Sequence, residues 1–260
     1  MPIPLYPEKY QHPSIVEPAD FLVYMRRCGK LPDDEPAPEA VILSYQKSLF
    51  DFVAKTQAVH FHSGFFRQHL AYLDETDGRV AIVGRFGIGA PAAAAMLEEL
   101  IAFGTRSFVS IGTAGSLVAD LGPGSVVLCS GALRDEGVSY HYVPGGGPAL
   151  PDESLTHALG NAFDAEGIGY RKGLGWTTDA VYRETRMELN SAVARGALTV
   201  DMEASALFTV ARYRGARIAA GFTISDTLDK PVWEPDFLSK DTKEGLERLY
   251  RAALASLTHQ

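Results

Sequence analysis

The chain has 260 residues and a formal net charge of −8, with 46% hydrophobic and 22% charged residues. This composition provides enough apolar material for a sizeable core, so a disordered chain is not expected. The acidic balance argues against a general nucleic-acid binder, which needs a basic face to neutralise phosphates. A small anionic substrate remains compatible with it, because one local cluster of arginine or backbone N–H groups is enough to bind an anion.

The two cysteines and the N-terminus bear on the cellular location. Cys28 and Cys129 form neither a CxxC pair nor a zinc-site spacing, so both thiols are expected to be reduced. The first seven residues contain no basic segment followed by an apolar core, and no apolar run along the chain is long enough to span a bilayer. We therefore expect a cytoplasmic protein that does not bind membranes.

In chain order, residues 1–39 are rich in proline and acidic side chains and are expected to form an N-terminal arm. From residue 40 to residue 260, short apolar runs alternate with helical patterns without an evident linker, which favours one domain. The runs typical of buried strands are residues 41–43, 80–83, 108–111 and 126–129.

Residues 91–103 are predicted to form a helix that begins with Pro91, is rich in alanine and leucine, and ends before Gly104. A strand on each side, at residues 80–84 and 107–111, makes this a right-handed βαβ unit. The pattern indicates an α/β fold.

A second unit combines a helix over residues 203–214, closed by Gly215, with a strand over residues 218–224. The last helix of the chain carries one apolar stripe at helical spacing, formed by Leu246, Leu249, Tyr250, Ala253, Leu254 and Leu257.

Two turns rich in small residues follow neighbouring strands. The first is Gly84-Arg85-Phe86-Gly87-Ile88-Gly89, between a strand and a helix, where backbone N–H groups commonly meet an anion. Alone, it is equally consistent with a tight turn that needs glycine for its backbone angles. The second is Ser110-Ile111-Gly112-Thr113-Ala114-Gly115, whose small side chains would open a cavity at the edge of the sheet.

Acidic residues lie at two further element ends. Asp201 and Glu203 open a helix, where Asp201 can cap the helix and Glu203 can interact with its dipole. Asp226 directly follows the strand at residues 218–224, a position well suited to exchanging protons in a pocket.

Five segments in fixed order carry a family resemblance. Together they resemble the nucleoside phosphorylase superfamily, which contains purine and uridine phosphorylases and has nucleosidases as relatives. Residues 80–129 are most similar to uridine phosphorylases, and the resemblance covers residues 80–228 and, more loosely, the last helix. The five segments are Gly84-Arg85-Phe86-Gly87-Ile88-Gly89, Ile111-Gly112-Thr113-Ala114-Gly115, Thr178-Asp179-Ala180-Val181-Tyr182, Asp201-Met202-Glu203-Ala204-Ser205-Ala206 and Ile224-Ser225-Asp226.

The resemblance implies a three-layer α/β/α fold with a mixed, partly barrel-like central sheet, assembled as a homodimer or homohexamer. It implies a nucleoside substrate, inorganic phosphate as co-substrate, and neither a metal nor an organic cofactor. It also implies roles for the residues that match the family motifs. Met202 would lie under the ribose, Glu203 would bond the ribose hydroxyls and stabilise a cationic sugar, and Asp226 would protonate the departing base, as in the purine-acting members.

Thr113 and the turn at Gly87 would bind the phosphate. The residues implied for the base are Gly115, Thr178, Tyr182, Glu184 and Arg186. Relatives carry an aromatic ring at the position of Val181, so Tyr182 or Phe222 would have to replace it. A solvated charge pair is the alternative interpretation of Glu184 and Arg186.

The phosphate side departs from the family pattern. Ser110 stands where the phosphorylases carry arginine, and residues 42–47 replace their N-terminal phosphate loop. The arginine that a neighbouring subunit usually contributes is not evident, although Arg67 lies near its place. Losing such contacts should weaken phosphate binding, because bidentate arginine contacts are the strong ones.

Three functions therefore stay open, with phosphorolysis favoured. Arg85, helped by Lys47, would replace the missing arginine as a phosphate ligand. Alternatively water is the nucleophile, although the nucleosidases use a glutamate where this chain has Gln46 and Lys47. The third possibility is a nucleoside-binding protein without turnover.

His60 and His62 resemble a metal pair only superficially, because no third ligand is visible, and surface or interface histidines are expected instead.

Overall fold

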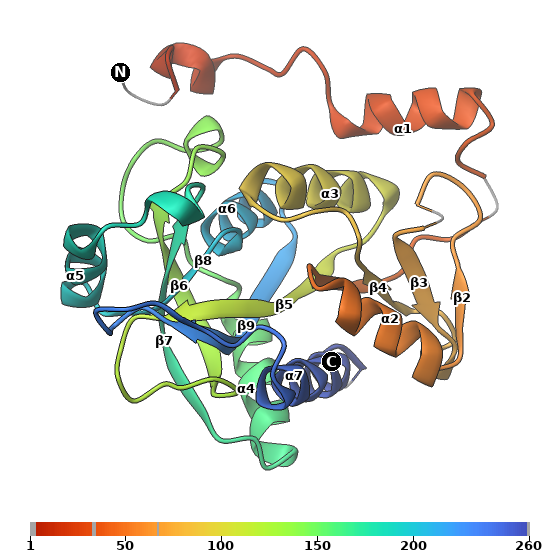
Figure 1. The fold of residues 1–260 in the computed structure, drawn as a ribbon. Coiled ribbons are helices and arrows are strands. Elements are labelled where there is room, and N and C mark those ends of the chain that lie inside the picture. The colour runs from red at the N-terminus through yellow and green to blue at the C-terminus, as the bar shows by residue number, and fades with distance from the viewer. Residues whose placement is uncertain (1–3, 33–34, 67, 259–260) are drawn as a thin grey trace.

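The computed structural model describes residues 4–32, 35–66 and 68–258 (Figure 1). The strands are β1 (Ala40–Ser44), β2 (Val59–Phe61), β3 (Leu70–Leu73), β4 (Val80–Val83), β5 (Ser107–Ser116), β6 (Val126–Asp135), β7 (Tyr170–Thr178), β8 (Ala197–Asp201), β9 (Arg217–Thr227) and β10 (Glu234–Pro235). The α-helices are α1 (Pro18–Arg27), α2 (Lys47–Thr56), α3 (Ala90–Phe103), α4 (Glu153–Ala165), α5 (Arg186–Ala194), α6 (Ala204–Tyr213) and α7 (Lys240–Thr258).

The strands of the described residues form one mixed ten-stranded sheet in the order β10-β9-β6-β7-β8-β5-β1-β4-β3-β2. An additional pairing of β9 with β5 closes the five strands β9, β6, β7, β8 and β5 into a barrel. The remaining strands extend from the barrel through β1, which pairs in parallel with both β4 and β5. The expected α/β fold with a partly barrel-like sheet is confirmed.

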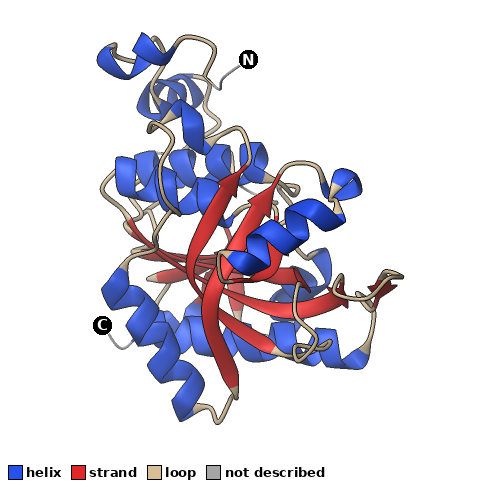
Figure 2. Cartoon of the chain, turned by 90° about the vertical axis from the view of Figure 1, so that its left-hand side faces the viewer, coloured by secondary structure: helices blue, strands red, loops and turns tan. Residues whose placement is uncertain are grey.

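Helices cover both faces of this sheet, as Figure 2 shows. One apolar cluster joins α3 and α6 to one face, with Leu97 and Leu207 fully buried. A second cluster joins α2, α4 and α7 to the opposite face, around Phe50, Phe163 and Leu249. The three layers match the expected α/β/α arrangement.

The elements expected from the sequence are present, several with different lengths. Helix α3 spans the predicted residues 91–103 plus Ala90 and ends at Gly104, whose φ is +141°. Strands β5 and β6 each have ten residues instead of the four expected, because small and polar side chains continue both strands into the barrel. Strands β7 and β8 complete the barrel and carry no long apolar run, which is why no strand was expected there.

The N-terminal segment contains a helix, α1, that packs on α3 and buries Leu22. Its attachment is reinforced by Arg214, which donates to Glu17 at 2.7 Å and to Glu98 of α3 at 2.6 Å. The expected arm at residues 1–39 is thus tied to the body by packing and by charge. None of the helices within the described residues is long and apolar enough to cross a membrane.

Helix α7 lies unusually close to β9 at one position. A Cβ added to Gly245 would lie 2.8 Å from Thr223 Cβ and closer still to Thr223 Oγ1. Thr223 is fully buried in the middle of β9 and has no room to yield. Glycine is therefore required here by packing and not by backbone angle.

We expect Gly245→Ala to lower the free energy of unfolding by about 1–3 kcal/mol, the usual cost of overpacking a core. Urea unfolding followed by circular dichroism measures the change. Gly169→Ala serves as the control, because a Cβ there would meet no atom within 4 Å. Equal stability of the two variants would contradict the packing argument.

Candidate active site

A cavity of about 640 Å³ opens where the ends of β5, β8 and β9 meet. The register explains the meeting point, because Gly115 of β5 lies opposite both Val200 of β8 and Asp226 of β9. The register of β5 with β9 shifts between Ala114, which lies opposite Ile224, and Gly115, which lies opposite Asp226, so Ser225 is an extra residue on β9. The predicted site residues that line this cavity are Thr113, Gly115, Tyr182, Glu184, Arg186, Met202, Glu203 and Asp226.

Glu203 is buried at the start of α6, and its carboxylate reaches the start of α3. Its Oε1 accepts a hydrogen bond of 2.6 Å from the backbone N–H of Gly89. The Gly-rich turn therefore does bring an N–H group to an acidic group, but that group is the protein's own Glu203 side chain. Burial, with a further contribution from Asp201, raises the pKa of Glu203 to about 8.

Asp201 serves mainly to hold the fold around Glu203. Its Oδ2 accepts from the backbone N–H groups of Glu203 at 2.9 Å and of Ala204 at 2.6 Å, and its Oδ1 accepts from the Thr177 hydroxyl at 2.8 Å. These bonds cap α6, as the helix-cap interpretation of Asp201 expects. Glu203 is the N-cap residue of α6, but its side chain makes no cap bond and lines the cavity.

Asp226 lies near the end of β9 with both carboxylate oxygens engaged. Oδ1 accepts from the Ser225 hydroxyl at 2.8 Å, and Oδ2 accepts from the indole N–H of Trp233 at 2.8 Å. Space for the carboxylate comes from Gly115, where a Cβ would lie 3.2 Å from Asp226 Oδ2 and would overlap Leu228. Gly115, in the second of the two turns rich in small residues, is therefore required because a Cβ would crowd the Asp226 carboxylate that it faces.

Among the residues expected to contact the base, Glu184 and Arg186 have different surroundings. Burial, followed by the charges of Asp226 and Glu188, raises the pKa of Glu184 to about 7. Arg186, at the start of α5, donates to the carbonyls of Leu228 and Lys230, both at 2.6 Å. The two side chains do not pair with each other, and the guanidinium of Arg186 is already bound to backbone.

The aromatic residues around the cavity differ from those expected. Tyr182 lies at the mouth with its ring almost fully exposed, whereas Phe222 is buried in the core. Trp233 and Phe237 line the cavity instead, with ring centroids 6.1 Å apart. Sequence reasoning missed both rings.

The cavity wall around Thr113 consists of uncharged groups. The Gln46 amide donates to Thr113 Oγ1 at 3.0 Å, while Gln46 Oε1 is buried without a partner. Next to it, the Tyr45 hydroxyl lies 2.9 Å from the Ser110 hydroxyl. Burial and the nearby charge of Glu203 raise the pKa of Tyr45 well above its ordinary value, so this phenol is neutral. Tyr45 and Gln46 were not predicted as site residues, although both lie after the first strand, in the segment that replaces the phosphate loop of the family.

The two cations expected to replace the missing arginine lie outside this wall. Arg85 forms an ion pair with Asp51 and lies 5.0 Å above the ring of Phe50, and Lys47 donates to Asp51 at 2.7 Å. Both side chains neutralise an acid of α2 and do not line the cavity. Gly87 and Thr178 also lie outside the lining, and Arg67 falls outside the described residues.

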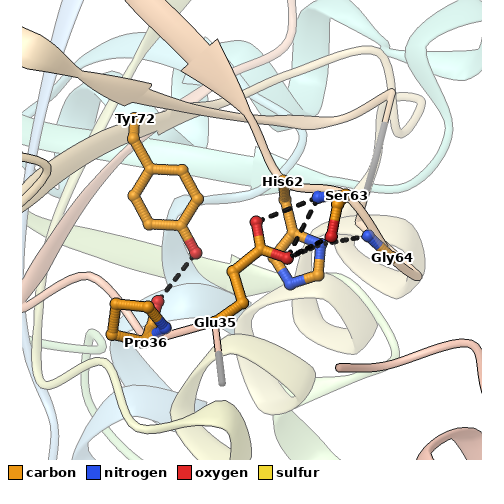
Figure 3. A network of polar contacts seen from close by, with 6 residues as sticks. All are labelled: Glu35, Pro36, His62, Ser63, Gly64 and Tyr72. Atoms are coloured by element: carbon orange, nitrogen blue, oxygen red, sulfur yellow. Dashed lines mark hydrogen bonds and ion pairs between the residues drawn. The ribbon is translucent and has the colours of Figure 1, made fainter. Parts of the chain in front are cut away.

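The two histidines belong to a different part of the molecule (Figure 3). His60 is exposed and paired with Asp74 at 2.7 Å, but His62 is fully buried against aromatic rings, which corrects the expectation of a surface or interface residue. Beside it, Glu35 accepts from the backbone N–H and the hydroxyl of Ser63. No group of three possible metal ligands is found within residues 4–32, 35–66 and 68–258.

Comparison with known proteins gives a consistent picture. A family model described as the phosphorylase superfamily matches residues 39–258. A guanosine phosphorylase from Halorubrum lacusprofundi is 33% identical over 187 residues, which are 70% of this chain and 77% of the relative. A uridine phosphorylase from Treponema pallidum is 33% identical over 170 residues, which are 60% of this chain and 65% of the relative.

Solved structures share the architecture. A purine nucleoside phosphorylase from Toxoplasma gondii, in complex with immucillin-H, superposes with a TM-score of 0.72 at 20% identity, covering 85% of this chain and 90% of its own. An AMP nucleosidase from Bacteroides thetaiotaomicron superposes with a TM-score of 0.67 at 25% identity, covering 84% and 88%. The first likeness concerns the fold alone.

Proposed function

Because the chain belongs to the phosphorylase superfamily, we propose that it cleaves the N-glycosidic bond of a purine nucleoside or uridine, with inorganic phosphate as the nucleophile. The observation that carries the proposal is that Glu203, Asp226 and Thr113 line one cavity. Similarity to a guanosine and a uridine phosphorylase supports it further. The reaction needs neither a metal nor an organic cofactor.

The proposed reaction uses the two carboxyl groups on different parts of the nucleoside. The C1′–N bond breaks, and its electron pair leaves with the base, which takes a proton from Asp226. The ionised Glu203 bonds the ribose hydroxyls and stabilises the positive charge that develops on the sugar. Met202 lies against the ribose, and phosphate held by Thr113 forms the new C1′–O bond. The products are the free base and ribose 1-phosphate.

The test of bond cleavage is incubation with a panel of nucleosides in phosphate buffer, followed by chromatography of the free base. We expect release from at least one purine nucleoside or from uridine. If every nucleoside on the panel stays intact while binding is detected by calorimetry, the protein is a nucleoside binder and the enzymatic proposal is wrong.

Hydrolysis is the second candidate, and the wall around Thr113 is compatible with it. In the described residues this wall presents the neutral groups of Tyr45, Gln46 and Ser110, which suit a water molecule as well as an anion. Similarity to an AMP nucleosidase structure is in line with this candidate. Omitting phosphate distinguishes hydrolysis from phosphorolysis, because hydrolysis would release base at the same rate without phosphate.

Gln46→Glu is expected to reverse the preference between the two nucleophiles. A carboxylate beside Thr113 repels phosphate by about 1–4 kcal/mol at close range, so the phosphate-dependent rate should fall at least about tenfold. The same carboxylate can accept a proton from water, so phosphate-independent release should rise. Base release is measured with and without phosphate, with the exposed Gln11→Glu as the charge-matched control. An unchanged ratio of the two rates would show that Gln46 does not contact the nucleophile.

We also propose a cytoplasmic location and a homodimer or homohexamer. Free Cys28 and Cys129 are compatible with a reducing compartment. Exposed Ile15 and Val16 on the N-terminal segment provide apolar surface for a second copy. A neighbouring subunit would also be a source for the cation that the described wall around Thr113 lacks.

A further inference from the structure

Trp233 occupies a special position in the chain segment that follows Asp226. The chain leaves β9 at Thr227, turns, and returns as β10, where Glu234 pairs with Thr227 and Pro235 with Asp226. This antiparallel return places Trp233 next to the carboxylate, and its indole N–H donates to Asp226 Oδ2 at 2.8 Å. The contact thus follows from backbone pairing on both sides of the turn.

The start of the same turn is held from outside. Arg186 donates to three successive carbonyls, those of Leu228, Asp229 and Lys230. Beyond the turn, the backbone N–H of Asp236 donates to the Ser225 carbonyl at 2.7 Å. Both ends of the turn are thus fixed to the body, which holds Trp233 beside the cavity.

The indole is nevertheless only partly covered. Trp233 is 54% exposed and Phe237 is 48% exposed, although both line the cavity. Aromatic rings that are left half-exposed in a cavity wall gain buried area when a flat ligand stacks on them. No ring is available at Val181, where the related enzymes are expected to have one. Of the other rings that line the cavity, Tyr182 is almost fully exposed at the mouth and Tyr45 lies in the wall around Thr113.

We propose that Trp233 has two roles in the reaction proposed above, on which this inference rests: its ring stacks on the nucleobase, and its N–H orients Asp226 toward the base. The stacking role replaces the ring missing at Val181 with one from the turn that precedes β10. The positioning role follows from the bond to Oδ2, because the Ser225 hydroxyl holds Oδ1 and the two bonds together fix the plane of the carboxyl group. An entering base therefore meets an acid that is already oriented.

Two substitutions separate these roles. Trp233→Leu removes both the ring and the N–H, so we expect the KM for the nucleoside to rise about 5- to 150-fold, the range of base–aromatic stacking, and kcat to fall as in Trp233→Phe. Trp233→Phe keeps a ring and removes only the N–H, so we expect kcat to fall about tenfold while KM changes little. Equal effects of both variants on KM and kcat would overturn the assignment of two roles.

Fluorescence tests the stacking without any turnover. The chain has two tryptophans, and Trp176 is buried and bound to Asp135 away from the cavity. Titration of the wild-type protein with hypoxanthine and with uracil is expected to quench the emission with at least one of the two bases. The quenching should persist in Trp176→Phe and disappear in Trp233→Phe. Quenching that persists in Trp233→Phe, or that neither base produces in the wild-type protein, overturns the inference.

The two proposals can fail separately. Base binding that quenches Trp233 without cleavage of any nucleoside would refute the proposed function and leave the stacking role intact. Cleavage of a nucleoside by Trp233→Leu with the wild-type KM would support the proposed function and refute the stacking role. Circular dichroism melting curves of each variant exclude unfolding as the cause of a lost signal.

Discussion

Asp226→Asn is expected to lower turnover of purine nucleosides by about 10²- to 10⁴-fold, the usual contribution of a general acid. Asparagine has nearly the same size, and its amide oxygen can still accept from Trp233 while its NH2 group donates to the Ser225 hydroxyl oxygen. What it cannot do is give a proton to the departing base. The loss should therefore appear in kcat, measured by base release, and not in the folding of the protein.

A leaving group that needs no proton provides the sharper comparison. With p-nitrophenyl riboside, the same variant should lose far less activity, because nitrophenolate departs without an acid. Asp120→Asn, at an exposed ion pair with Arg171, is the matched control and should retain wild-type rates with both substrates. An Asp226→Asn enzyme with wild-type rates on purine nucleosides would show that another group protonates the base.

Glu203→Gln is expected to reduce kcat/KM by about 10²- to 10³-fold, comparable to the removal of one electrostatic stabiliser of a transition state. The amide oxygen can still accept from the N–H of Gly89, but the negative charge facing the sugar is lost. Glu166→Gln, an exposed change of the same type, is the control and should leave the rate unaltered.

The pH profile separates a charge effect of Glu203 from a steric one. Its pKa is raised from 4.5 to about 8 by burial, so the free enzyme holds it mostly protonated at neutral pH. The ionised form is the one that stabilises a cationic sugar, so kcat/KM should rise with pH up to about 8 and level off above it. This rise of kcat/KM with pH should be absent in Glu203→Gln. A wild-type profile that is flat between pH 6 and about 8 would contradict the assigned role.

The contribution of Glu203 to the free energy of unfolding should change with pH in the direction opposite to kcat/KM. A carboxyl group with a pKa that is higher in the folded protein binds its proton more tightly there than in the unfolded chain. The folded state is therefore favoured at low pH, and Glu203 costs stability as the pH rises from 4.5 toward about 8. The buried acid is thus retained at the expense of stability at the pH where it is active, which is common for functional groups.

The place of Asp226 and Glu203 in one cavity was largely predictable from the sequence. Asp226 and Glu203 each lie at the end of an element that local patterns define. The strands that lead to them, β9 and β8, both meet β5 at Gly115, β9 in parallel and β8 in antiparallel. The fold followed from the same patterns, since β1, β4 and α3 are made of apolar runs with clear end signals. Local patterns do not predict the closure of the barrel. This closure depends on the pairing of β7 with β8, between residues that are far apart in the sequence.

The residues that sequence reasoning missed or assigned elsewhere all depend on such long-range contacts. Trp233 reaches Asp226 only because the two-residue strand β10 folds back on β9. Arg85 ends a strand in the expected place, but an acid on α2, Asp51, takes up its charge. Arg186 binds carbonyl groups of a turn 42 or more residues away, and backbone acceptors cannot be recognised from side-chain types.

The most direct test is the fate of phosphate during the reaction. The protein is incubated with a purine nucleoside and inorganic phosphate, and ³¹P NMR is recorded while the free base is quantified. We expect the resonance of ribose 1-phosphate to grow in equal amount with the released base, and both to be nearly absent with Asp226→Asn. Release of base by the wild-type protein while inorganic phosphate remains unconsumed would contradict phosphorolysis.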